Sequence, residues 1–268
     1  SLQHPQFRQA ILEHLEGLTF PEALRRLAER AGVDLPETRD PAVIAEDRRR
    51  RSERDRILAV CEAAAAYYEA QLHPAARAPF SELARGALEE RGITAETATR
   101  FRLGYAPARW DGLTAHLRER GYSPADAELA GLLVPSMRGH GGHGGNGGNG
   151  GGAWHDRFRH RLMFPIFDRA GKVVAFSGRI LPESEDMPEG IVPAEGAAKY
   201  LNSPESPVFT KGENLYGLQA ARLTMRQRAS GVVVEGNFDV VQMHQHGFTE
   251  TVAPLGTAFT PEQAQLLR

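Results

Sequence analysis

The stretch that decides the fold is Val232-Val233-Val234-Glu235-Gly236-Asn237-Phe238-Asp239. Its three β-branched residues predict a short apolar strand that Gly236 ends. The pattern then predicts a helix over residues 238–246, a second strand over residues 251–255 and a further helix beginning at Thr260-Pro261. Strand, helix, strand and helix in this order indicate a parallel α/β unit, whose remainder we expect after residue 268.

Two carboxylates in this stretch are candidate metal ligands. Glu235 stands at the carboxyl end of the first strand, where α/β folds place their sites, and Gly236 allows a backbone or ligand to approach closely. Asp239 follows in the first turn of the next helix. Mg²⁺ prefers oxygen ligands and usually takes one or two carboxylates from a protein. The alternative is an acidic strand end at which Asp239 favours the helix dipole, and spacing alone leaves both open.

A hairpin precedes this unit. Residues 163–167 and 173–177 are apolar runs that flank Asp168-Arg169-Ala170-Gly171-Lys172, a turn signal. Cations dominate around it, because residues 154–182 contain Arg157, Arg159, Arg161, Arg169, Lys172 and Arg179 against Asp156 and Asp168. The first three alternate and share one face if the chain is extended. Such a face either tracks a phosphate backbone or is a solvated polar strand face.

A polar segment with two lysines lies between the hairpin and the strand at 232–234. It contains Lys199-Tyr200-Leu201-Asn202-Ser203-Pro204-Glu205 and, a little later, Phe209-Thr210-Lys211-Gly212. Lysine is a compact charge that can hold a phosphate. Tyr200 is able to stack on a base, and Asn202 to hydrogen-bond a base or sugar. Taken locally, the segment is also consistent with an ordinary polar loop.

The N-terminal half is predicted to be helical. Helical patterns cover residues 20–32, 57–72, 81–100 (broken at Gly92, with Thr94 as an N-cap), 111–120 and 124–131 (opened by Ser123-Pro124). Residues 40–56 are dominated by charge, which favours a solvated helix or linker over a nucleic-acid arm.

Residues 139–152 are of low complexity. They contain ten glycines, two histidines and two asparagines, which cannot bury apolar surface, so they predict a mobile loop. A metal site at His140 and His143 is not expected, because such a loop fixes no ligand geometry.

Composition limits the class of protein. The 268 residues suit one large domain or two small ones, and 41% are apolar, enough for a core. No apolar run is long enough to cross a bilayer, and residues 1–5 do not resemble a signal peptide. The single cysteine, Cys61, excludes an internal disulfide or a Cys-based zinc finger within this sequence, so we expect a cytoplasmic protein. The net charge of −2 argues against a uniformly basic nucleic-acid binder, although the distribution of charge matters more.

Taken together, these stretches resemble the DnaG-type bacterial replicative DNA primases. The resemblance rests on the order and spacing of several motifs over nearly the whole chain: Phe20-Pro21-Glu22-Ala23 through Leu35-Pro36, Leu88-Glu89-Glu90-Arg91-Gly92-Ile93, Phe101 through Pro107 with Trp110-Asp111, Asp156-Arg157-Phe158-Arg159 with Met163-Phe164-Pro165-Ile166, Phe176-Ser177-Gly178-Arg179, Lys199 through Glu205, Lys211-Gly212 with Leu215-Tyr216-Gly217, Val234 through Val241, and Pro254-Leu255-Gly256-Thr257. The Lys199–Glu205 run is the most specific.

The resemblance implies a mixed α+β and α/β fold in three parts. These are a trailing helix of a zinc-module region with a charged linker over residues 1–50, a basic subdomain that guides single-stranded template over 51–228, and the start of a toprim domain over 229–268. It implies that Glu235 is the catalytic acidic residue and a ligand of Mg²⁺ or Mn²⁺, supported by Asp239. It also implies that Arg91, Arg179, Lys199, Tyr200, Asn202 and Lys211 contact template or nucleotide phosphates.

Some features depart from the family pattern and qualify this expectation. The zinc-binding Cys and His residues precede the core in the family, and its Asp-x-Asp metal ligands fall after residue 268, so we expect residues 1–268 alone to be inactive. Residues 139–152 are an insertion. Asn237-Phe238 replaces the more usual Tyr-Met.

The resemblance implies RNA primer synthesis on single-stranded DNA from ribonucleoside triphosphates. A replicative helicase is the expected partner, through a C-terminal domain, and no membrane is involved. The rival readings are a toprim nuclease or topoisomerase fragment, against which the Lys199–Glu205 run argues, and a module that only binds single-stranded DNA.

Overall fold

The computed structural model describes residues 28, 41–136, 154–187, 190–191, 198–256 and 258–267. The chain divides into two compact units, Ser1–Arg51 and Ser52–Arg268. The helix expected over residues 20–32 (apart from residue 28) and the loop expected over 139–152 lie outside the described residues, as does most of the expected trailing helix.

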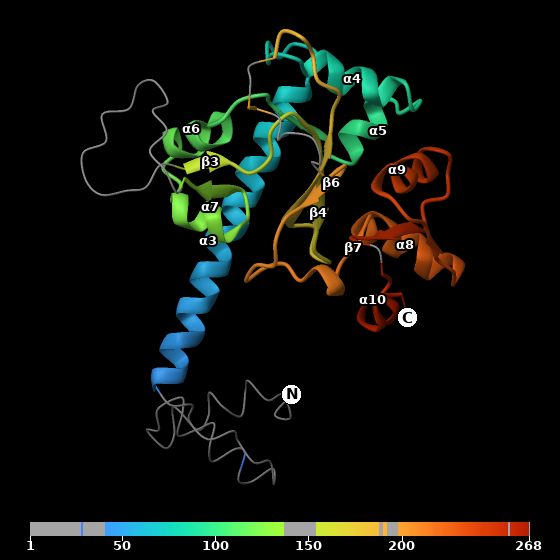
Figure 1. Cartoon of the computed structure of the whole chain (residues 1–268). Helices are drawn as coiled ribbons and strands as arrows, with labels where there is room; N and C mark the ends of the chain where they lie inside the picture. Colours follow the sequence, from blue (N-terminus) through green and yellow to red (C-terminus); the bar gives the residue numbers. More distant parts are fainter. Residues whose placement is uncertain are drawn as a thin grey trace, which may run out of the picture. The chain divides into compact units, whose positions relative to one another are not determined.

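Helix α3 (Pro41–Leu72) contains both the charged stretch and the helical pattern that follows it. Its charged part is a solvated helix, as expected, with an ion pair of 2.9 Å between Arg50 and Glu46. From Ile57 onward, buried residues recur at helical spacing on one face: Ile57, Val60, Cys61, Ala64, Tyr68 and Leu72. This face packs on a sheet, as the edge-on contact of Tyr68 with Phe176 shows, with ring centroids 5.5 Å apart. In Figure 1, the part of α3 that belongs to the second unit runs beside the strands labelled β4 and β6.

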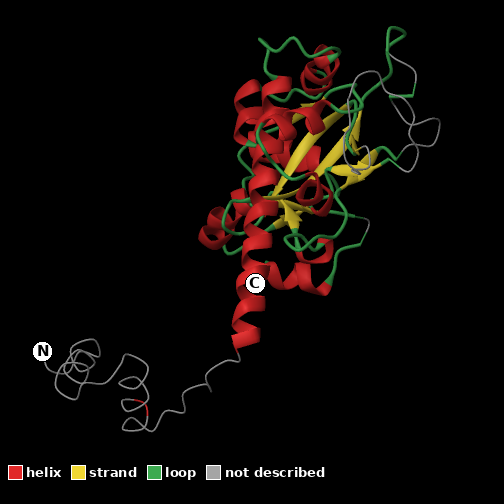
Figure 2. Ribbon diagram, turned by 90° about the vertical axis from the view of Figure 1, so that its left-hand side faces the viewer, coloured by secondary structure: helices red, strands yellow, loops and turns green. Residues whose placement is uncertain are grey.

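The main sheet confirms the predicted hairpin. Its order is β1-β4-β5-β6, and all neighbours are antiparallel: β1 (Gly104–Ala106), β4 (Arg161–Phe167), β5 (Val173–Ile180) and β6 (Tyr200–Asn202). Asp168 shapes the hairpin turn, because its Oδ1 accepts hydrogen bonds from the amides of Ala170 at 2.8 Å and Lys172 at 2.9 Å. In Figure 2 the strands lie together, with helices beside them.

The predicted helix pair over 81–100 is confirmed as α4 (Ser81–Glu89) and α5 (Ala95–Arg100). Gly92 separates them in a left-handed conformation with φ of 65°, which glycine adopts without strain. Thr94 caps α5, since its Oγ1 accepts a hydrogen bond from the amide of Thr97 at 3.2 Å. Arg91 therefore stands in a tight turn between two helices.

A small peripheral layer is held together by one carboxylate. It contains α6 (Gly112–Glu119), α7 (Pro124–Leu129) and the antiparallel pair of β2 (Leu133–Pro135) and β3 (Trp154–Asp156). Asp156 is 3% exposed. Its carboxylate accepts hydrogen bonds from the amides of Leu113 at 2.7 Å and Thr114 at 2.9 Å and from the Thr114 hydroxyl at 2.7 Å. Asp156 of β3 thus caps the N-terminus of α6. Asp111, the residue directly before α6, makes no side-chain hydrogen bond to the helix.

The C-terminal segment has the predicted strand-helix-strand order. It contains the 3₁₀ turn η1 (Lys211–Glu213), β7 (Leu215–Tyr216), α8 (Leu218–Arg228), β8 (Val232–Val233), α9 (Asn237–Gln245), β9 (Thr251–Pro254) and α10 (Pro261–Leu266). The pairing of β8 with β9 is parallel, as predicted, and Thr260 caps α10 with a capping box. Strand β7 adds an antiparallel edge that the sequence did not predict, giving the order β7-β9-β8.

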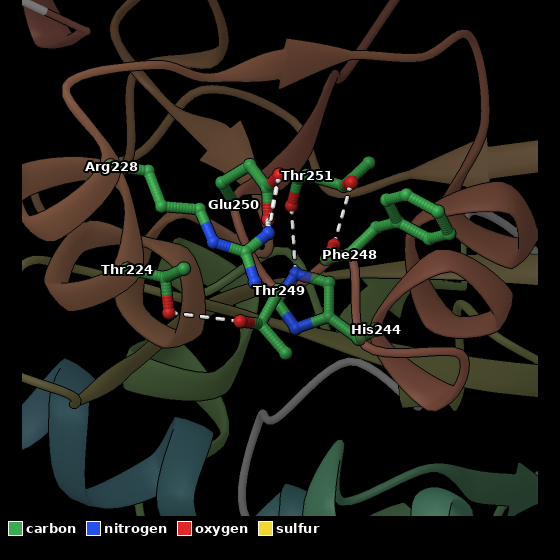
Figure 3. A network of polar contacts seen from close by, with 7 residues as sticks. All are labelled: Thr224, Arg228, His244, Phe248, Thr249, Glu250 and Thr251. Carbon is green, nitrogen blue, oxygen red and sulfur yellow. Dashed lines mark hydrogen bonds and ion pairs between the residues drawn. The ribbon is translucent and has the colours of Figure 1, made fainter.

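A polar network anchors the amino end of β9 to the helices beside it (Figure 3). Arg228 of α8 forms two hydrogen bonds, of 2.8 and 2.7 Å, with the carboxylate of Glu250. Nε2 of His244 lies 2.8 Å from the main-chain oxygen of Thr251, and the hydroxyls of Thr224 and Thr249 are 2.8 Å apart. These contacts fix α8, α9 and β9 relative to one another at the end of the strand remote from Glu235.

Five aromatic rings join the main sheet to the C-terminal segment. Phe164 of β4 is in contact with Phe238, Tyr216 and Tyr200, with ring centroids 5.0, 6.0 and 6.5 Å apart, and Phe101 stacks on Tyr216 at 6.2 Å. The α/β segment is thereby packed directly against the antiparallel sheet. In the described ranges, no helix has the length and apolar character needed to span a bilayer.

Candidate active site and nucleic-acid interface

The two carboxylates lie at the junction of β8 and α9. The amide of Val234 still bonds the main-chain oxygen of Val252 at 2.9 Å, so Glu235 is the first residue beyond the ladder, and its side chain is exposed. Gly236 is the N-cap of α9, and Asp239 is exposed in the first turn. A Cβ on Gly236 would stand 3.0 Å from Oδ2 of Asp239, so the absence of a side chain there lets Asp239 turn back toward the strand end.

This donor set fits a hard cation such as Mg²⁺. Both side chains are exposed carboxylates, and such a cation retains waters and binds substrate phosphates in addition to one or two protein carboxylates. Among the described residues, no group of three or more His, Cys, Asp and Glu side chains is arranged to hold a metal. Glu235 and Asp239 therefore provide at most two carboxylate ligands of a metal site, and its other ligands would have to come from elsewhere.

Two of the predicted binding residues lie against one ring in the first turn of α9, and a third is bonded to one of them. The guanidinium carbon of Arg91 lies 4.3 Å from the centroid of Phe238, and that of Arg179 lies 5.4 Å from it. Nη1 of Arg179 also donates to the hydroxyl of Tyr200 at 3.3 Å. Arg91 and Arg179, which are far apart in sequence, thus meet at Phe238, three positions after Glu235, and Tyr200 is joined to them through Arg179.

Asn202 and Lys211 meet elsewhere, at Leu255-Gly256. Nδ2 of Asn202 donates to the main-chain oxygen of Leu255 at 2.8 Å. Cε of Lys211 is 3.2 Å from where a Cβ on Gly256 would stand. Lys199 precedes β6, where its main-chain oxygen accepts from Ile180 at 3.0 Å and its side chain is exposed.

The predicted common face of Arg157, Arg159 and Arg161 is wrong. The chain turns between β3 and β4, where His160 has a φ of 48°, so the alternation is interrupted. Arg161 is only 3% exposed and donates from Nη1 to the main-chain oxygens of Gly178 at 2.9 Å and Ala198 at 3.2 Å. A solvated strand face is equally excluded, because these arginines are half-buried or buried.

Burial leaves these three charges poorly solvated. Desolvation lowers the pKa of Arg157 and of Arg159, and it lowers the pKa of Arg161 to about 10, with neighbouring Arg159 adding to the effect. Within the described ranges, none of the three forms an ion pair with a carboxylate.

Trp110 was not among the candidate binding residues that the sequence indicated, and its surroundings make it one. Its ring is 47% exposed, the guanidinium carbon of Arg159 lies 4.4 Å from the ring centroid, and the His155 ring touches it edge-on. An exposed tryptophan beside an arginine is typical of surfaces on which nucleic-acid bases stack. The available signal was the Trp110-Asp111 pair, which the resemblance used only as a family marker.

Two family models match the chain. The DNA primase catalytic core, N-terminal domain, matches residues 67–222, and the toprim domain matches residues 231–268. The DNA primase of Deinococcus radiodurans is 40% identical over 256 residues, which is 96% of this chain and 38% of that protein. The chain thus spans well under half the length of this curated relative.

Solved structures agree with these matches. The RNA polymerase domain of Mycobacterium tuberculosis primase DnaG has a TM-score of 0.67 and 36% identity, covering 80% of this chain and 61% of that one. A DnaG primase catalytic domain bound to single-stranded DNA has a TM-score of 0.60 and 34% identity, covering 81% and 58%. The chain therefore belongs to the DnaG-type DNA primase family, and it contains the N-terminal domain of the catalytic core followed by toprim sequence.

Proposed function

We propose that the protein synthesises short RNA primers on single-stranded DNA by condensing ribonucleoside triphosphates. The observation that carries this proposal is the meeting of Arg91 and Arg179 at Phe238, three residues from the strand-end carboxylate of Glu235. Phosphate-binding groups and a candidate metal ligand from different parts of the chain are thereby brought to one place. Nucleotidyl transfer requires both, because catalysis there is mostly positioning and charge stabilisation.

Template binding is the role we assign to two pairs of an arginine with an aromatic ring and to two lysines. Arg159 with Trp110, and Arg179 with Tyr200, each combine a charge for the phosphate backbone with a ring for a base. Lys199 and Lys211 add compact charges. The relative solved with single-stranded DNA supports this assignment.

We assign the chemistry to the carboxylates at the β8–α9 junction. Glu235 would hold Mg²⁺ (or Mn²⁺) as a direct ligand, and Asp239 would support it from the first turn of α9. The bound ion supplies charge stabilisation for the reacting phosphates and the leaving pyrophosphate. Arg91 and Arg179 orient the phosphates, and Asn202 positions the main chain at Leu255.

The wider context is also proposed from the family. A zinc module upstream of the core, a replicative helicase as partner and a cytoplasmic location follow from a role in chromosome replication. The toprim nuclease and topoisomerase readings are not favoured, because the matched N-terminal domain is that of the primase core.

Primer synthesis tests the proposal. In a protein extended to the length of its curated relatives, Glu235→Gln should abolish RNA synthesis on a single-stranded template, because the amide keeps the shape but loses the charge. Asp239→Asn should reduce it less if Asp239 only orients the site. Residues 1–268 alone should bind Mn²⁺ weakly and make no primers. Full activity of the extended Glu235→Gln protein would refute the assignment, and an extended wild-type protein that only binds DNA would favour a binding module.

A further inference from the structure

Phe238 occupies an unusual position for a buried ring. It is 3% exposed, is packed edge-on against Phe164 with centroids 5.0 Å apart, and yet has the guanidinium groups of both Arg91 and Arg179 within 5.4 Å of its centroid. An aromatic face attracts cations electrostatically, and the attraction strengthens where water is partly excluded. The buried ring of Phe238 thus provides one fixed aromatic face that both positive charges contact.

The main chain of Arg91 is held independently of its side chain. Two glutamines of α9 bind the turn between α4 and α5: Nε2 of Gln242 donates to the oxygen of Arg91 at 2.7 Å, and Nε2 of Gln245 donates to the oxygen of Gly92 at 2.7 Å. Oε1 of Gln245 also accepts from the amide of Thr94 at 2.9 Å. These hydrogen bonds hold the main chain at Arg91 in place. They do not set the direction of its side chain, which depends on the contact of the guanidinium group with Phe238.

Arg179 comes from a different element, β5, and reaches the same ring from the antiparallel sheet. Its one side-chain hydrogen bond among the described residues is to Tyr200, at 3.3 Å. In the same ranges neither Arg91 nor Arg179 is paired with a carboxylate, so neither charge is neutralised. Phe238 is thus a contact that both arginines share.

We propose that Phe238 is a positioning residue for nucleic-acid binding. Its ring orients Arg91 and Arg179 together, so that an anionic phosphate backbone meets both in a fixed relation to Glu235, three residues before the ring. The inference rests on the proposed function, which assigns phosphate binding to these two arginines. It adds a role for a side chain that touches no ligand itself, at a position where the family more usually has methionine.

The experiment measures the affinity of residues 1–268 for a fluorescent single-stranded oligonucleotide. Phe238→Met conserves volume and apolar character but removes the aromatic face. It should weaken binding about five-fold, the range of a partly desolvated cation–π contact, without lowering the melting temperature appreciably. Phe238→Tyr, which restores an aromatic face, should bind within about two-fold of the wild type.

A double-mutant comparison separates positioning from a general packing effect. In the Arg91→Ala/Arg179→Ala background, Phe238→Met should cause no further loss, because the ring then has no guanidinium to orient. Phe238→Leu provides the same comparison if methionine disturbs the packing on Phe164.

The outcomes distinguish the inference from the proposed function. If the arginine double variant is weakened but Phe238→Met binds like the wild type, or if Phe238→Met costs the same factor in both backgrounds, the positioning role is wrong and the proposed function stands. If the arginine double variant binds like the wild type, phosphate binding by these arginines fails and the inference fails with it.

Discussion

Asn202 on β6 donates a hydrogen bond from Nδ2 to the main-chain oxygen of Leu255, 2.8 Å away and 53 positions later in the chain. The bond joins the edge strand of the antiparallel sheet to the loop that follows β9 in the α/β segment. A residue that the sequence marks as a nucleotide contact thus has a structural use as well. This hydrogen bond holds the Lys199–Glu205 run beside the carboxyl end of β9.

Asn202→Ala should lower the free energy of unfolding by about 1–2 kcal/mol, because the carbonyl of Leu255 loses its donor at a partly buried site. Urea unfolding measures this. The matched control is Asn214→Ala, which removes a bond of the same chemistry to Thr210 only four residues away, so it should cost less. If the two variants lose the same free energy of unfolding, the long-range hydrogen bond stabilises the fold no more than the local one does. If DNA affinity falls while stability does not, Asn202 acts on the ligand directly.

Binding to single-stranded DNA should depend steeply on salt, because counterions are released from the phosphates. Replacing Arg179, Lys199 or Lys211 by alanine should weaken binding of all sequences and reduce the salt slope by about 0.7 for each phosphate that the protein no longer neutralises. Arg226→Ala is the control, since Arg226 lies on α8, whose C-terminal part is fixed to the amino end of β9. An affinity that is flat between low and physiological salt contradicts the assignment.

Replacing residues 139–152 by a short Gly-Ser linker should leave both the melting temperature and DNA affinity unchanged. Pro135 and Trp154 are paired directly across the β2–β3 ladder, so the two ends of the segment are held together without it. Glycine-rich sequence contributes little apolar burial. A marked fall in the melting temperature would show that the insertion contributes to folding, and a fall in affinity alone would show that it contacts DNA.

Asp156 should make stability depend on pH. Burial raises the pKa of its carboxyl from 3.8 to about 6, although the hydrogen bonds from Leu113 and Thr114 act to lower it. The folded state then holds the proton more tightly than the unfolded chain does. The contribution of Asp156 to the free energy of unfolding is therefore greatest below pH 4, falls as the pH rises from 4 to 6 and is constant above pH 6. Relative to Asp156→Asn, the wild type should lose up to about 3 kcal/mol over this interval in urea unfolding. A difference that is flat, or that grows with pH, contradicts this.

The sequence by itself determined the turns, helix breaks and helix caps, because each depends on residues that are close together in the chain. The hairpin turn at Asp168, the glycine break at Gly92 and the caps at Thr94 and Thr260 each depend on residues within a few positions, so their patterns are legible in one stretch of chain. The parallel β8–α9–β9 unit follows from alternating strand and helix patterns for the same reason. The family, too, was recognisable, because motif order survives in sequence.

Helix α8 and the short strands β1, β2, β6 and β7 were not predicted. Each of these strands has three residues or fewer, too few for a period of two to emerge, and they exist because partners elsewhere in the chain supply the ladder. Helix α8 is rich in polar residues and leaves Leu223 65% exposed, so its apolar stripe is weak.

Tertiary structure alone decided how the candidate binding residues are grouped. Arg91 and Arg179 are 88 positions apart in the sequence, and only the docking of α9 on the α4–α5 turn and on β4 brings both to Phe238. Likewise, the turn at His160 converts an apparently alternating basic face into buried and half-buried arginines, of which Arg159 and Arg161 bond main-chain oxygens. A sequence specifies which charges are present, but their solvation and their partners depend on long-range packing, because burial is a property of the assembled core and not of any one segment.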